Sequence, residues 1–112
     1  MYSVKDLPPE MSQLREVQGS GYEIIDVIKQ IKAMNAELKA LEEAWELKSW
    51  NKAYTKPEPF RRLRMRPARN IGYEAAGVKE LMAKLEERIV YMRAKLDVER
   101  DRKNWNQEWQ DN

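Results

Sequence analysis

The chain contains no cysteine and no histidine among its 112 residues. It therefore cannot form a disulfide, a thiolate or imidazole zinc site, a cysteine nucleophile or a Ser-His-Asp triad. Glycine and proline are also scarce, at four and five residues, which excludes collagen-like chains. These absences exclude much chemistry. Together with an incomplete acidic pattern, described below, they lead us to expect a non-enzymatic protein with no catalytic residue, no metal site and no cofactor.

Long hydrophobic runs are missing as well. No window approaches the roughly 18 consecutive apolar residues of a membrane-spanning helix, and the first ten residues lack the apolar core of a signal peptide. The charged fraction of 36% would fit a disordered chain, but a net charge of +2 together with four Trp and six Met favours a folded one. We expect one helical domain over residues 1–112, in the cytoplasm or associated with a particle, with no membrane partner.

A seven-residue apolar repeat runs through residues 21–50. Such a stripe, recurring every 3.5 residues, predicts a helix with a coiled-coil seam. Ser20 and Glu23 fit a capping box at its start, so the predicted helix spans residues 20–54. Seven of the eight seam positions are apolar; the eight are Ile24, Val27, Ile31, Met34, Leu38, Leu41, Trp45 and Lys48.

A second repeat runs through residues 71–96, with Asn70 as candidate N-cap. Nothing after Gly77 would break a helix, so the prediction extends over residues 71–109. No alternating apolar–polar run supports a strand. All eight seam positions are apolar: Ile71, Ala75, Val78, Met82, Leu85, Ile89, Met92 and Leu96.

The predicted connector, residues 55–70, contains three prolines and cannot continue the first helix. Two amphipathic helices joined in this way most simply fold back antiparallel, although a domain swap offers the same contacts. The expected fold class is all-α: a long antiparallel two-helix coiled-coil hairpin with a short N-terminal helix over residues 7–18. Its core is thin, which favours an oligomer.

The antiparallel register also predicts what the N-terminal helix contacts. It places Met11 and Leu14 against Trp109 and Trp105, at the far end of the second helix. The N-terminal helix would then cover part of a second apolar set on the second helix, which lies off the seam. A homodimer or a partner protein is the alternative cover for this set, made of Val90, Tyr91, Ala94, Val98, Trp105 and Trp109.

Arginine is concentrated at the connector. Residues 48–69 hold eight basic residues and one acidic residue, and five arginines fall within nine positions. Arginine binds phosphate bidentately, and aromatic residues nearby in sequence could stack on bases, so DNA or RNA is one candidate partner. An acidic protein or the chain's own acidic helices are the alternatives. The candidate contact residues are Arg61, Arg62, Arg64, Arg66 and Arg69.

One acidic cluster on the first helix raises an enzymatic alternative. Glu42, Glu43 and Glu46 form an EExxE pattern that resembles half of the magnesium site of all-helical nucleotide pyrophosphohydrolases. The matching ExxD on a second helix is missing, and the three glutamates fall mostly on the solvent side of the heptad. A solvated helix face is the favoured interpretation.

These patterns favour an interaction or assembly module. The expected partner is another protein or a second copy of the chain, with a candidate interface at Val98, Trp105 and Trp109. Nucleic-acid binding at the arginine-rich connector is the alternative. Small accessory proteins of phages and mobile elements share this size and architecture.

Overall fold

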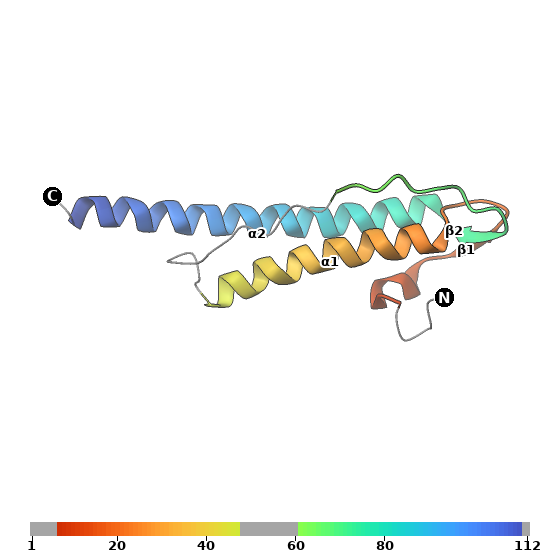
Figure 1. The fold of residues 1–112 in the computed structure, drawn as a ribbon, viewed down its shortest axis with the longest axis horizontal. Coiled ribbons are helices and arrows are strands. Elements are labelled where there is room, and N and C mark those ends of the chain that lie inside the picture. Colours follow the sequence, from red (N-terminus) through yellow and green to blue (C-terminus); the bar gives the residue numbers. More distant parts are fainter. Residues whose placement is uncertain (1–6, 48–60, 111–112) are drawn as a thin grey trace.

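The computed structural model describes residues 7–47 and 61–110, with side chains as far as Glu46 in the first range and Arg102 in the second. The first described elements are a 3-10 helix, η2 (Pro9–Gln13), and a short strand, β1 (Glu16–Gln18). The long helix α1 (Ile24–Leu47) follows. After the second strand, β2 (Ile71–Tyr73), the longest helix, α2 (Ala75–Gln110), completes the elongated molecule (Figure 1).

The predicted packing of two long helices on one another is confirmed. Their seam residues form the core, because an apolar stripe on each helix is removed from water only against the other. Six seam positions are exceptions. Ile24, at the first position of α1, and Ile71, in β2, are exposed, Trp45, Ala75 and Met92 are half-buried, and Lys48 lies outside the described residues. The buried seam residues are Val27, Ile31, Met34, Leu38, Leu41, Val78, Met82, Leu85, Ile89 and Leu96.

The predicted antiparallel direction is wrong, because α1 and α2 begin at the same end and run parallel (Figure 1). Tyr22 and Tyr73, which precede the two helices, exchange backbone hydrogen bonds of 2.8 and 3.1 Å. At the other end, the Lys95 ammonium lies 3.9 Å from the centre of the Trp45 ring. The heptad stripes are the same for either direction, so the stripes themselves did not distinguish the two arrangements.

A two-stranded sheet that the sequence patterns did not indicate joins the helix starts. β1 and β2 pair antiparallel, with Val17 opposite Gly72. Gly21 has a positive φ of 86°, and a Cβ there would collide with the carbonyl oxygen of Tyr73. The backbone N–H of Val27 donates to the carbonyl of Glu23, so the first helical turn starts from Glu23. Ser20 lies three residues before that start and therefore does not cap α1.

The N-terminal segment also differs from its prediction. Residues 7–18 form η2 and β1 in place of one helix, and they lie at the end of the molecule where both helices begin, below α1 in Figure 1. Met11 is buried in the core, and Leu14 lies within van der Waals reach of a Cβ placed at Gly77. Because Trp105 comes 28 residues after Gly77, about 40 Å along a helix, the predicted contact of Leu14 with Trp105 is excluded.

The helices also differ in length. α2 continues for fifteen residues beyond Lys95, whereas α1 ends two residues beyond Trp45. The end of α2 therefore extends past the end of α1, by about 20 Å at 1.5 Å per residue (Figure 1). Among the described helices, neither is apolar enough over a sufficient length to cross a bilayer.

Candidate functional site

The part of the connector that the structure describes, residues 61–70, is not a hairpin tip. We call it the arginine segment. It runs beside the helices in extended form, back toward the end at which both of them begin (Figure 1). Arg66 lies beside Asp26 near the start of α1, and Leu63 lies beside Gln30 one turn further along. The parallel direction requires this arrangement, because the chain has to return to the start of α1 before α2 begins.

Two buried polar residues of α1 hold the arginine segment. The Oε1 atom of Gln30 accepts the backbone N–H of Leu63 at 2.7 Å. Asp26 accepts the backbone N–H of Arg66 at 2.9 Å and also binds its guanidinium, with Nε at 2.9 Å and Nη2 at 3.2 Å. These hydrogen bonds from Arg66 hold the pKa of the Asp26 carboxyl below its usual 3.8. Arg66 is therefore a structural clamp on α1.

A second arginine of the segment pairs with α2. Arg62 forms an ion pair and hydrogen bond with Glu86, which lowers the pKa of that carboxyl. The alternative in which the arginines contact the chain's own acidic helices thus holds for Arg62 and Arg66. The other three candidates, Arg61, Arg64 and Arg69, are exposed, and the described residues show no ion pair for them.

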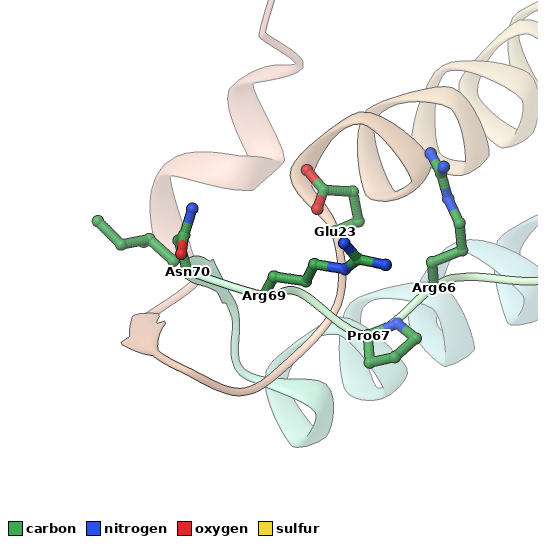
Figure 2. A pocket seen from close by; sticks show the side chains of 6 residues that line it. Glu23, Arg66, Pro67, Arg69 and Asn70 are labelled. Carbon is green, nitrogen blue, oxygen red and sulfur yellow. The ribbon is translucent and has the colours of Figure 1, made fainter.

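A pocket of about 650 Å³ opens where the arginine segment meets the start of α1. Figure 2 shows Glu23, Arg69 and Pro67 around it, with the Arg66 side chain rising toward α1. The lining contains one carboxylate, Glu23, and two arginines, of which Arg66 is already paired with Asp26, so it carries little excess positive charge. This balance does not favour a site for a free anion.

The outer face of α2 carries an uncovered apolar surface. Tyr91 and Val98 follow the buried Ile89 and Leu96 by two positions, or about 200° around the helix, so they lie opposite the seam. Val90, Tyr91 and Val98 are 61%, 63% and 58% exposed. We call these three residues, together with the exposed Ala94, the outer stripe. No described element covers it, and η2 lies at the end of the molecule where both helices begin (Figure 1).

A hollow of about 380 Å³ adjoins the outer stripe. Tyr91 and Met92 supply its apolar part, while Glu42, Glu87 and Arg88 supply charged groups. Arg88 donates to Glu42 at 3.3 Å across the two helices. The surface is thus an exposed aromatic ring beside a shallow depression with charged groups around it.

The candidate interface residues separate into two groups. Val98 is exposed on the outer stripe, as an interface residue should be. Trp105 and Trp109 belong to α2, whose backbone continues to Gln110, but their side chains lie outside the described residues. Among the described side chains, no group of acidic residues is arranged to hold a metal ion.

Three residues that position these surfaces had no sequence signal. Asp26, Gln30 and Glu37 lie beside the α1 seam and look like ordinary solvated positions, yet all three are buried. The Glu37 carboxylate accepts a hydrogen bond from Nε of Arg93 on α2 at 2.7 Å. Their polar atoms meet partners that are 33 to 56 residues away in the chain, which local periodicity does not reveal.

The comparisons with known proteins give no further indication of function. No family model, no curated protein and no solved structure matches this chain.

Proposed function

We propose that this protein is a non-enzymatic interaction module that assembles with a protein partner through the outer stripe of α2. The observation that carries the proposal is the exposure of Val90, Tyr91 and Val98 on the side of α2 opposite the core. A pair of helices needs only one apolar stripe on each partner, so a second stripe has no use in the folded monomer. Large exposed apolar side chains grouped on one face favour a docking surface.

The shape of the molecule supports the same proposal. The two packed helices and the clamped arginine segment form a support, and α2 projects beyond it (Figure 1). A helix of this length that leaves its partner helix exposes its sides to other chains. Burial of each of the three exposed side chains of the outer stripe would contribute about 1.5–3 kcal/mol to the free energy of binding, before the cost of association is subtracted.

A photoreactive side chain at Tyr91 tests the proposal in cells of the natural host. Replacing Tyr91 with benzoylphenylalanine should give a covalent protein adduct on irradiation, and the adduct should survive nuclease treatment. The same replacement at Ala36, which is exposed on α1, is the matched control. Equal labelling at positions 36 and 91, or no protein adduct at all, would remove the basis of the proposal.

Nucleic-acid binding is the second candidate, and the three arginines outside the described ion pairs favour it. If Arg61, Arg64 and Arg69 contact phosphates of a single strand, replacing all three with Gln should reduce the slope of log K against log salt by about 2. The control, Arg62→Gln, removes a charge that already pairs with Glu86 and should change the slope less. No binding of a single-stranded oligonucleotide at low salt would reject this candidate.

A further inference from the structure

The charge that α1 exposes to solvent over residues 24–40 is entirely basic. This stretch contains two acidic residues, Asp26 and Glu37, and both are buried. Their carboxylates bind Arg66 of the arginine segment and Arg93 of α2. The acidic groups of this stretch thus serve contacts inside the molecule, whereas all its basic residues are exposed; these are Lys29, Lys32 and Lys39.

The three lysines share one face of α1, which we call the lysine face. At 100° per residue they fall about 60° to 140° around the helix from Asp26, in the direction away from the seam. Asp26 and Gln30, which hold the arginine segment, form the edge of this face. Lys29 is near enough to Asp26 that its charge adds to the Arg66 hydrogen bonds in lowering the pKa of that carboxyl. The lysine face therefore adjoins the arginine segment.

The arginine segment continues the positive surface along this edge. Arg64 lies between Leu63 and Arg66, the two residues whose backbone N–H groups are held by α1, and it is exposed. Arg61 and Arg69 are exposed toward the two ends of the segment. Carboxylates flank the surface only at its ends, where Glu23 lies near Arg69 (Figure 2) and Glu43 follows the last lysine.

The charges of α2 are distributed differently. Between Ala75 and Arg102 this helix carries seven basic and six acidic residues, so its charges nearly cancel. The excess positive charge of the described residues is thus collected on α1 and the arginine segment, on one side of the molecule. Surfaces of this kind attract polyanions over a distance of about one Debye length.

The composition of the lysine face favours phosphates over a protein or a membrane. Between residues 25 and 40, all of which the structure describes, it has no aromatic residue and no exposed large apolar side chain. Protein interfaces depend on apolar and aromatic anchors, and helices that bind membrane surfaces insert apolar side chains. Binding to backbone phosphates requires neither, because charge attraction and counterion release supply its affinity.

We infer that the lysine face and the arginine segment together form one binding surface for the phosphates of a nucleic-acid strand. The inference rests on the second candidate function, nucleic-acid binding, and extends its site onto α1. Lys29 and Lys39 are ten residues, about 15 Å, apart along the helix, so they contact different phosphates. Because contacts to phosphate carry no base information, binding should not depend on the sequence of the strand.

The salt dependence of binding is the first test. For a single-stranded DNA of mixed sequence, the combined variant Lys29→Gln and Lys39→Gln should reduce the slope of log K against log salt by about 1.4, or about 0.7 for each lost contact. The control, Lys84→Gln with Arg102→Gln, removes the same charge from α2, about 160° around that helix from Glu86, and should leave the slope unchanged. All four substituted positions are exposed, so the helical circular dichroism should match that of the wild type.

Protection from acetylation is the second test, and it uses the natural chain. Acetylation by an activated acetate ester, located by mass spectrometry, should slow several-fold at Lys29 and Lys39 when the oligonucleotide is bound. Lys84 should react at the same rate with and without it, because it lies on the opposite side of α2 from the arginine segment.

The outcomes separate the inference from the candidate function. Protection of both lysines together with the smaller slope supports the inference. Binding that weakens only when Arg61, Arg64 and Arg69 are replaced, with both lysines unprotected, overturns the inference and leaves nucleic-acid binding in place. No binding of the oligonucleotide at low salt overturns both. Equal protection by polyglutamate, or protection by vesicles containing phosphatidylserine but not by the oligonucleotide, overturns the inference and identifies an acidic protein or a membrane as the occupant.

Discussion

Asp26 binds Arg66, a residue forty positions further along the chain. It accepts the backbone N–H of Arg66 and both prongs of its guanidinium, while its own side chain is only 12% exposed. A carboxylate this sheltered requires donors around it, because water no longer supplies them. The arginine segment therefore depends on Asp26 more than its own exposed surface would indicate.

We expect Asp26→Ala to lower the free energy of unfolding by about 1–3 kcal/mol, because the Arg66 N–H loses its acceptor near the core. Denaturant unfolding followed by circular dichroism measures the change. Glu43→Ala, on the exposed side of the same helix, is the matched control and should stay within about 0.5 kcal/mol of the wild type. Equal effects of the two substitutions would show that Asp26 does not hold the segment.

The same ion pair predicts a dependence on pH. The pKa of Asp26 in the folded protein is below 3.8, so its contribution is fully present above about pH 5 and is lost as the pH falls through the lowered pKa. The difference in unfolding free energy between wild type and Asp26→Ala should therefore shrink between about pH 5 and pH 2. Urea titrations at several pH values check this, and a difference that is constant with pH would contradict it.

At the scale of elements, α2 presents two apolar faces with different roles. Leu41 on α1 is completely buried against the seam of α2, whereas Val98 is 58% exposed on the outer stripe. The first face stabilises the single chain, and the second stays exposed to solvent. Substitutions in the two should separate stability from assembly.

We expect Leu41→Ala to cost about 2–5 kcal/mol in unfolding free energy, since it removes a buried side chain and leaves a cavity. Val98→Ala should change the stability of the dilute protein by less than about 0.5 kcal/mol, because little of its side chain is removed from water. Thermal melts of both variants at low protein concentration compare them. A large loss for Val98→Ala under these conditions would mean that another part of the chain covers the stripe.

The elements differ in how far the sequence could predict them. Both long helices and most of their buried residues followed from the heptads, since burial of one face leaves a period in the sequence. The strands did not, because each has three residues and Gly72 occupies the middle of β2. The sequence also left open whether Arg62 and Arg66 contact carboxylates of the chain itself or an external phosphate. An arginine that clamps Asp26 looks the same in the sequence as one that binds phosphate.

The whole molecule has a direction that apolar periodicity does not encode. Seam residues of the two helices are buried equally well whether the helices run parallel or antiparallel. The backbone pairing of Gly21 and Tyr22 with residues 67–73 brings the helix starts together, and it depends on glycines that allow close approach. Direction is therefore decided by a few residues outside the helices.

Spin labels at engineered cysteines should confirm the parallel direction. A label at Glu46 should lie within about 20 Å of one at Arg102, and about 30 Å or more from one at Ala76, because α2 advances 1.5 Å per residue. All three positions are exposed, so labelling should not disturb the core. Pulsed electron resonance measures both distances, and the reverse order of distances would restore the antiparallel hairpin.

The parallel direction has a consequence for the order of folding. The hydrogen bonds between the described parts of the two helices join residues 46 and 56 positions apart, so their pairing cannot begin from contacts that are close in sequence. Closing a loop of about 50 residues costs about 1.4 kcal/mol more entropy than closing one of about ten, and contacts of this range slow folding. During synthesis, at about 5–20 residues per second, α1 emerges several seconds before the partner stretch of α2. For that interval its apolar stripe is available to water, to chaperones or to the α1 of a neighbouring nascent chain.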